Sequence, residues 1–254
     1  MAVIWQKEVD GKLHEVRSVG ETRRLYTDGV FHSQFNLNHP VTGSIWDLML
    51  LPAFFTQPGT IQRILVLGVG GGAVMRQLAY FLKPETITGI EISPHHLHIA
   101  KHYFGVVGKP YELVQADAIG WLRSYHGKPF DLIIDDLYGE MDGQARRSIA
   151  PDAGWFNLLT NNLSDNGILV MNFLDNKELR QSAWYSSPTI SQKLPYAFKL
   201  TTILYQNAVA AFLRQESSSQ VLRKYIQQIP ELDPRKRSTR LRYGIRRLKR
   251  PEHI

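Results

Sequence analysis

The chain has 254 residues, of which 43% are hydrophobic, and its 30 Lys and Arg against 23 Asp and Glu give a net charge of +7. This length and apolar content suffice to bury one substantial core plus a small appendage. The absence of cysteine excludes disulfides, thiolate nucleophiles and cysteine-ligated metals. No segment offers the roughly 20 continuous apolar residues of a membrane span, and the first residues lack the long apolar region of a signal peptide, so we expect a cytoplasmic protein that contacts no membrane.

Residues 1–40 alternate polar and apolar side chains around two turn signals, Asp10-Gly11 and Asp28-Gly29. This pattern predicts a small N-terminal antiparallel β-hairpin region. Residues 45–55 are mostly apolar and predict a helix that packs beside the first strand of the next domain. We interpret its apolar stripe, which includes Trp46, as part of the hydrophobic core. The alternative is that this stripe lines the pocket of an acceptor substrate.

Residues 64–91 are typical of a strand, a glycine turn, a helix and a second strand. Ile64 to Leu67 is an unbroken apolar run, as in a strand buried on both faces of a parallel sheet. Glu91 lies about 20 residues beyond the glycines, where an acid can accept hydrogen bonds from both hydroxyls of a ribose. The pattern therefore predicts a cofactor site, either dinucleotide or S-adenosyl, whose loop is formed by Gly68, Gly70, Gly71 and Gly72.

Two further strands are predicted to end in acids. Residues 111–115 precede Asp117, which is placed to accept a hydrogen bond from an adenine amino group, and residues 130–135 end at Asp135 and Asp136. Three consecutive strands thus bring carboxylates to the ligand-binding edge of an open α/β sheet. Ile92 and Ala118, next to these acids, are expected to contact the same cofactor. Asp135 is either a structural acid at a strand end or a catalytic one.

The remaining elements complete a Rossmann-like domain over residues 41–215. Residues 155–163 predict a helix and residues 167–173 a fifth strand. Residues 197–204 and 208–213 resemble the paired final strands of class I methyltransferase folds. We therefore expect an α/β protein with a class I methyltransferase sheet and a small N-terminal antiparallel β appendage.

Residues 216–254 are predicted to form a basic C-terminal tail. From Ser217 onward there are eleven Lys and Arg against three acids. A segment of this charge is suited to holding RNA, DNA or an acidic protein, and the alternative is a solvated tail that only aids solubility. A homodimer is a further possible assembly.

Residues 16–213 resemble the spermidine synthases and the methyltransferase-like proteins that share their fold. In that family the corresponding motifs are Gly-Gly-Gly-Asp-Gly, Glu-Ile-Asp, Asp-Gly or Asp-Ala, and Asp-Ser-Ser-Asp-Pro. Here their places are taken by Gly68-Val-Gly-Gly-Gly72, Glu91-Ile-Ser93, Asp117-Ala118 and Asp135-Asp-Leu-Tyr-Gly139. The resemblance implies the fold and a site for an adenosyl cofactor, with Asp135 near the transferred group.

The departures from the family motifs concern the polyamine site. The loop Asp corresponds to Gly71, the catalytic Asp to Tyr138, and a Tyr-His pair to Ile45 and Trp46. Buried ammonium groups require carboxylate partners, and those partners have largely been replaced. Gly71 also removes a negative charge that would repel the carboxylate of intact S-adenosylmethionine.

We therefore predict a transferase that uses S-adenosylmethionine, most simply a methyltransferase with an unknown methyl acceptor. Asp135, Asp136 and Tyr138 are the catalytic candidates because they would orient that acceptor. The first alternative is a spermidine synthase that uses decarboxylated S-adenosylmethionine, and the second is a non-catalytic cofactor-binding module attached to nucleic acid. We expect no metal, since His95, His98 and His102 share a helical face without an accompanying Glu in the helix.

Overall fold

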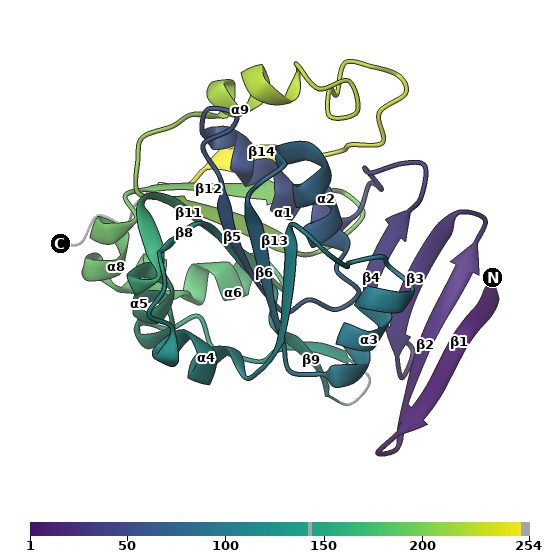
Figure 1. Ribbon diagram of the computed structural model, residues 1–254. Helices are drawn as coiled ribbons and strands as arrows, with labels where there is room; N and C mark the ends of the chain where they lie inside the picture. Colours follow the sequence, from purple (N-terminus) through teal and green to yellow (C-terminus); the bar gives the residue numbers. More distant parts are fainter. Residues whose placement is uncertain (142–143, 250–254) are drawn as a thin grey trace.

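The structure is a three-layer α/β arrangement with a second, antiparallel sheet at one side (Figure 1). It is a computed structural model that describes residues 1–141 and 144–249. In this part of the chain an eight-stranded mixed sheet forms the middle layer, and helices cover both of its faces. The expected fold class, an α/β sheet with an N-terminal β appendage, is confirmed.

The large sheet has the strand order β14-β12-β13-β11-β8-β5-β6-β7. Neighbouring strands from β11 to β7 run parallel, whereas β13, β12 and β14 are joined by antiparallel pairs. The strands are β5 (Arg63–Leu67), β6 (Thr86–Glu91), β7 (Tyr111–Gln115), β8 (Phe130–Asp135), β11 (Leu163–Phe173), β12 (Tyr196–Thr201), β13 (Ala208–Leu213) and β14 (Gly244–Arg247).

The central strands are apolar because the sheet is covered on both faces. Ile64 to Leu67 of β5 are all 0% exposed, as the unbroken apolar run predicted. The chain continues to β6 and β7 on one side of β5 and returns to β8 and β11 on the other. Open α/β sheets bind ligands at the carboxyl ends of strands where the strand order reverses in this way. The edge of the sheet beyond Leu67 is therefore the place for a site.

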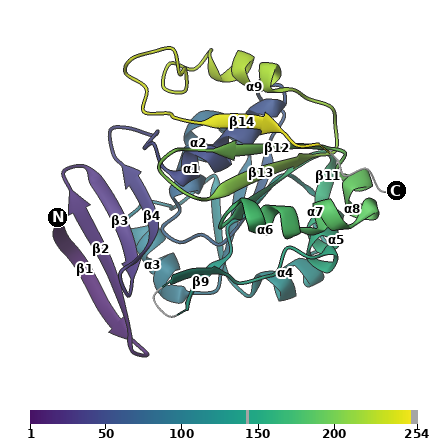
Figure 2. The ribbon, with the colours of Figure 1, turned by 180° about the vertical axis from the view of Figure 1, so that it is seen from behind.

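Two groups of helices pack on the two faces of the sheet (Figures 1 and 2). Polar side chains fix the start of several of them: the Ser93 hydroxyl accepts a hydrogen bond from the His96 amide at 3.2 Å, and the Asp117 carboxylate from the Gly120 amide at 2.7 Å. No helix of the described chain is both long enough and apolar enough to cross a lipid bilayer. One face carries α1 (Ile45–Leu50), the 3₁₀ helix η1 (Leu51–Phe55), α2 (Ala73–Leu82), α3 (Pro94–His102) and α9 (Ser219–Ile226), and the other α4 (Ala118–Ser124), α5 (Ala153–Asn161), α6 (Asn176–Gln181), α7 (Ala183–Ser186) and α8 (Pro188–Lys193).

The N-terminal sheet is a four-stranded antiparallel meander rather than a single hairpin. Asp10-Gly11 and Asp28-Gly29 turn it, and all four residues have positive φ, as two-residue hairpin turns of the favoured hand require. The Ala73 amide donates to the Ser33 hydroxyl at 3.3 Å, which joins the last strand to the start of α2. The strands are β1 (Ala2–Val9), β2 (Lys12–Val19), β3 (Thr22–Thr27) and β4 (Val30–Asn36).

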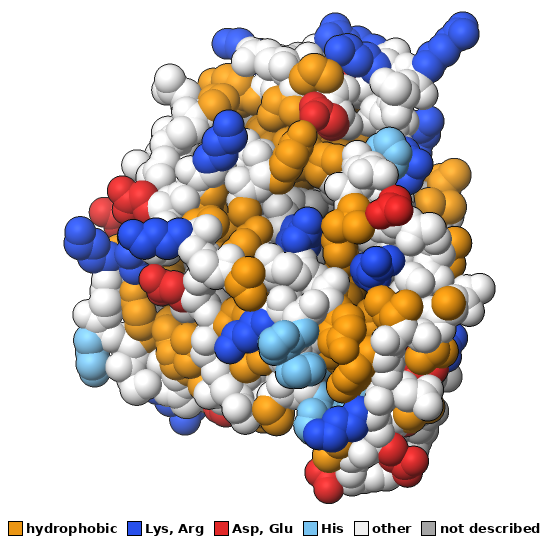
Figure 3. Space-filling view, turned by 45° about the vertical axis from the view of Figure 1, so that its right-hand side comes forward, with side chains coloured by type: hydrophobic (Ala, Val, Ile, Leu, Met, Phe, Trp, Pro, Cys, Tyr) orange, Lys and Arg blue, Asp and Glu red, His pale blue; other side chains and the backbone are white. Residues whose placement is uncertain are grey.

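The basic segment from residue 216 is not a separate tail, which corrects the sequence-based expectation. The Ser217 hydroxyl donates to the Phe55 carbonyl at 2.7 Å, and α9 follows on the same face of the sheet. Leu232 and Leu241 are 0% and 1% exposed, and β14 then pairs with β12 as the edge strand (Figure 2). The cations after α9 lie at the surface: Arg235, Lys236, Arg237 and Arg240 are exposed. Lys and Arg side chains stand out at the top of the molecule (Figure 3).

Candidate active site

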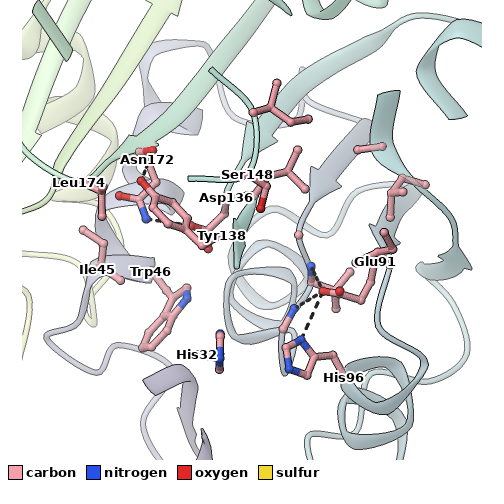
Figure 4. A pocket seen from close by; sticks show the side chains of 18 of the residues that line it. His32, Ile45, Trp46, Glu91, His96, Asp136, Tyr138, Ser148, Asn172 and Leu174 are labelled. Atoms are coloured by element: carbon pink, nitrogen blue, oxygen red, sulfur yellow. Dashed lines mark hydrogen bonds and ion pairs between the residues drawn. The ribbon is translucent and has the colours of Figure 1, made fainter. Parts of the chain in front are cut away.

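A cavity of about 400 Å³ opens at the carboxyl ends of β5, β6, β7, β8 and β11. Its size lies in the range of small-molecule sites. We call the part lined by Gly68, Gly70, Glu91, Ile92, Asp117 and Ala118 the glycine half. The opposite part, which we call the tryptophan half, is lined by Phe31, Ile45, Trp46, Tyr138, Asn172, Leu174 and Tyr205, and Figure 4 shows both halves.

Of the four predicted loop glycines, Gly68 and Gly70 line the cavity and Gly71 and Gly72 do not. Gly68 has φ +84°, and a Cβ there would lie 2.3 Å from the Asp136 carbonyl oxygen. Only glycine therefore fits where the loop passes the end of β8. A Cβ on Gly71 would lie 2.6 Å from the Phe104 ring, and one on Gly72 2.6 Å from a methyl group of Val106. These two glycines therefore allow close packing of the loop, and their expected contact with the cofactor stays a prediction.

Glu91 holds the glycine loop through its side chain. Its carboxylate accepts hydrogen bonds from the amides of Val69 and Gly70, both at 3.0 Å, and from the Ser93 amide at 2.9 Å. Burial raises the pKa of Glu91, but hydrogen bonding and the nearby charge of His96, together with the backbone amides, outweigh burial and leave the pKa below its usual value. The group is therefore a carboxylate at neutral pH. Its predicted bond to a ribose stays a prediction.

His96 is a site residue that the sequence reasoning missed. Its Nδ1 lies 3.7 Å from the Glu91 carboxylate, and its Nε2 lies 3.2 Å from the Thr27 hydroxyl, which in turn lies 3.1 Å from His14 Nδ1. Burial first, and then the proximity of His96 and His95, lowers the pKa of His14 to about 4, so His14 is neutral at physiological pH. This chain of contacts connects the N-terminal sheet to the cavity, and Figure 4 shows its last step, between His96 and Glu91. The local signal for it is its position. Ser93 follows the strand-end acid Glu91 by two residues and caps α3, and His96 lies in the first turn of that helix.

Ile92, Asp117 and Ala118 form the far end of the glycine half, and their contact with a cofactor stays a prediction. Asp117 is exposed, and its Oδ2 is the atom that caps α4. The Ile92 side chain is also largely exposed, so it is available to contact a ligand.

Asp135 does not line the cavity, in contrast to its expected catalytic and cofactor-binding roles. It is 0% exposed, and its Oδ2 accepts hydrogen bonds from the indole of Trp155 at 2.7 Å and from the Arg147 guanidinium. Arg147 also donates to the carbonyl of Asn172 and belongs to the hairpin of β9 (Tyr138–Met141) and β10 (Gln144–Arg147). Asp135 therefore anchors this hairpin to the end of β8, which is a positioning role.

Asp136 is the acid that the end of β8 directs into the cavity. Its Oδ1 accepts a hydrogen bond from the Asn172 side-chain amide at 2.8 Å, and the Asn172 Oδ1 accepts one from Asn207 at 3.1 Å. Burial raises the pKa of Asp136 to about 7; the Asn172 hydrogen bond opposes this shift, while the charge of Asp135 adds to it. A carboxyl group with this pKa can accept and release a proton at neutral pH.

Tyr138 lines the tryptophan half beside Asp136. Its hydroxyl donates to the Asn172 carbonyl at 2.7 Å, and burial raises its pKa far above the ordinary value. Tyr138 therefore remains a neutral phenol at physiological pH. Its hydroxyl hydrogen is used by the Asn172 carbonyl, so it is suited to shaping the cavity rather than to proton transfer.

Comparison with protein-family models identifies residues 47–227 as a spermine/spermidine synthase domain. The chain belongs to this family. Polyamine aminopropyltransferase of Neisseria meningitidis is 26% identical over 159 residues, which cover 61% of this chain and 59% of that protein. Polyamine aminopropyltransferase 2 of Caldanaerobacter subterraneus is 28% identical over 103 residues, 39% of this chain and 34% of that protein. The matches thus span between a third and three fifths of these relatives.

Solved structures agree with this family in fold. The crystal structure of a probable spermidine synthase from Corynebacterium glutamicum superposes with a TM-score of 0.71 at 16% identity, over 89% of this chain and 88% of that one. Human methyltransferase-like protein 13 in complex with SAH superposes with a TM-score of 0.62 at 16% identity, over 76% of this chain and 93% of that one. The names of the curated relatives favour the aminopropyltransferase alternative over the methyltransferase expected from the sequence.

Proposed function

We propose that this member of the spermine/spermidine synthase family transfers an aminopropyl group from decarboxylated S-adenosylmethionine to an amine. The observation that carries the proposal is the position of Asp136, which adjoins the glycine loop through its backbone and the tryptophan half through its carboxyl group. The curated relatives, all named as polyamine aminopropyltransferases, support the same reaction class.

The glycine half has the composition of a site for an adenosyl donor. Gly68 and Gly70 present bare backbone to the cavity. Glu91 and Asp117 place two carboxylates near the ends of neighbouring strands, where they are suited to accept hydrogen bonds from ribose hydroxyls and from an adenine amino group. The sulfonium donor supplies an electrophilic carbon: the acceptor nitrogen forms a bond to it, the carbon–sulfur bond breaks, and its electron pair remains on the sulfur of methylthioadenosine.

Asp136 would remove the proton that the acceptor nitrogen must lose. An ammonium group has no free electron pair, so deprotonation precedes attack, and a carboxylate whose conjugate acid has a pKa of about 7 is suited to this step at neutral pH. Asn172 fixes the carboxyl group through its hydrogen bond, and Asn207 in turn fixes Asn172. The residues of the chain thus supply mainly orientation and a proton acceptor.

Methyl transfer from intact S-adenosylmethionine is the second candidate, and one observation favours it. The position that corresponds to the family's loop Asp is Gly71, whose Cα faces the Phe104 ring at a distance that leaves no space for a side chain. Among the described residues the acids that line the cavity are Glu91, Asp117 and Asp136. The loop itself therefore provides no carboxylate to hold the amino end of an aminopropyl group.

Calorimetry with S-adenosylmethionine, its decarboxylated form and methylthioadenosine separates the two candidates. Aminopropyl transfer requires tight binding of the decarboxylated form, and a primary amine incubated with it should gain an aminopropyl group by mass spectrometry. Tighter binding of intact S-adenosylmethionine, together with a methylated amine as product, would instead establish the methyltransferase. The absence of binding by all three compounds would refute both.

A further inference from the structure

The tryptophan half has a rigid apolar wall. Trp46 and Ile45, the first residues of α1, are 5% and 8% exposed, and the rings of Trp46 and Phe31 pack edge to face with centroids 5.3 Å apart. Leu174, after β11, also lines this half and lies on the same side of the view as Ile45 and Trp46 (Figure 4). An acceptor in this half is therefore placed among apolar side chains held by the core.

One carboxyl group, that of Asp136, faces this wall. The other two acids of the cavity lining, Glu91 and Asp117, lie in the glycine half, where they hold the loop and cap α4. Asp47, next to Trp46 in sequence, is turned away and accepts hydrogen bonds from the Gly43 amide at 2.6 Å and from Gln77.

Asp175 and Glu178 are the next acids along the chain after β11. Asp175 caps α6, where its carboxylate accepts hydrogen bonds from the Lys177 and Glu178 amides at 2.7 and 2.8 Å. Glu178 is also engaged. Its carboxylate accepts a hydrogen bond from the Leu174 amide at 2.8 Å, and the residue is not part of the described cavity lining. The polar groups of Asn172 are likewise used, by Asp136, Asn207 and Tyr138. The described residues of the tryptophan half can therefore pair one ammonium group with a carboxylate.

We propose that the acceptor is a primary monoamine with an apolar body, such as an alkylamine or arylalkylamine, rather than a diamine. This inference rests on the proposed function, because it assigns the tryptophan half to the acceptor. The amine would meet Asp136 while the apolar body packs on Trp46, Ile45 and Leu174. A diamine would carry its second ammonium group to the same wall, where it loses water and gains no carboxylate. An aromatic face attracts a cation more weakly than a carboxylate does.

A matched pair of amines tests this inference. 1,4-Diaminobutane and n-pentylamine have the same length and differ only in whether the far end is an ammonium or a methyl group. We expect n-pentylamine to bind at least tenfold more tightly, by calorimetry in the presence of methylthioadenosine, and to react with at least tenfold higher kcat/KM in the presence of decarboxylated S-adenosylmethionine. Equal or tighter binding of 1,4-diaminobutane, or no binding of either amine, would overturn the inference.

A charge placed on the wall should reverse the preference. Leu174→Glu adds the missing carboxylate, and Leu174→Gln is the matched control of the same size without charge. We expect the glutamate variant to shift the ratio of the two binding constants toward 1,4-diaminobutane by at least tenfold relative to the glutamine variant. The same ratio in both variants would contradict the assignment of this wall to the far end of the acceptor.

The binding measurement separates the inference from the reaction. If n-pentylamine binds more tightly than 1,4-diaminobutane but neither gains an aminopropyl group, the proposed reaction fails while the acceptor class stands. If 1,4-diaminobutane is the better ligand and is converted to the aminopropylated product, the proposed reaction stands and the acceptor class is wrong.

Discussion

The substitution Asp136→Asn tests the central residue of the site in two independent ways. Asparagine keeps the shape of the side chain and an oxygen that can accept the Asn172 hydrogen bond, but it cannot take up a proton. If Asp136 is the proton acceptor, kcat should fall by about 10²- to 10⁴-fold. The rise of wild-type activity through pH 7, as Asp136 ionises, should be absent from any residual activity of the variant.

The same substitution should change how stability depends on pH. Burial raises the pKa of Asp136 from an ordinary value of 3.8 to about 7, so the folded protein holds a proton that the unfolded chain has released. The stabilisation is fully present below pH 3.8 and is lost as the pH rises through 7. Within this window, each rise of one pH unit lowers the free energy of unfolding by about 1.4 kcal/mol. Between pH 5 and pH 8 the wild type should therefore lose about 3 kcal/mol of unfolding free energy relative to Asp136→Asn.

Urea denaturation of both proteins at pH 5 and pH 8 measures this difference. Asp165→Asn is the matched control, since its carboxylate is fully exposed and lies 3.7 Å from an Arg214 nitrogen at the surface. We expect the control to follow the wild type at both pH values. A difference between wild type and Asp136→Asn that stays constant from pH 5 to pH 8 would show that Asp136 ionises normally, and the argument for it as a proton acceptor at neutral pH would fail.

Three further predictions concern other parts of the molecule. Glu91→Ala should weaken donor binding by about 1 to 3 kcal/mol in calorimetry, because ribose hydroxyls and loop amides lose a charged acceptor, and an unchanged dissociation constant would contradict this role. Leu241→Ala should cost about 2 to 5 kcal/mol in denaturant titrations, since the side chain is fully buried, whereas Leu204→Ala at an exposed position should cost less than about 0.5 kcal/mol. We also propose that the cationic cleft between α6 and β14 binds RNA. Replacing Lys199 and Arg246 by Ala should weaken the binding of single-stranded RNA and reduce the salt dependence of that binding, both measured by fluorescence anisotropy. Equal binding by the wild type and the variant would show that this cleft does not bind RNA.

The strands around the cavity could be predicted from the sequence because their signals are local. An unbroken apolar run such as Ile64 to Leu67 fits a strand covered on both faces, and the glycines that follow leave few other conformations. The fold of the central sheet and the family followed from these patterns. The boundaries were less well defined: η1 continues α1 with tighter 3₁₀ geometry from Leu51, and β11 begins at Leu163 rather than at residue 167.

The choice between Asp135 and Asp136 could not be made from the sequence. Side chains alternate between the two faces along a strand, so adjacent acids at its end point in different directions. Asp136 enters the cavity because Arg147 and Trp155 bind the carboxylate of Asp135 and hold it away from the cavity. The contact of His96 with Thr27 has the same character, because it joins residues 69 positions apart through the docking of the N-terminal sheet.

The basic C-terminal segment shows why composition misled the prediction of a tail. Its cations dominate the charge count, but apolar residues at intervals between them pack inward: Leu232 and Leu241 are buried, and Ile245 and Leu248 lie against the two hydrophobic cores. Deleting the segment would therefore remove an edge strand along with the charges. Loss of RNA binding after such a truncation would not distinguish a lost contact from a damaged fold. Substitutions on the outer surface, compared with Leu241→Ala, separate the two effects, because one removes charge with the strand in place and the other weakens the packing with the charge retained.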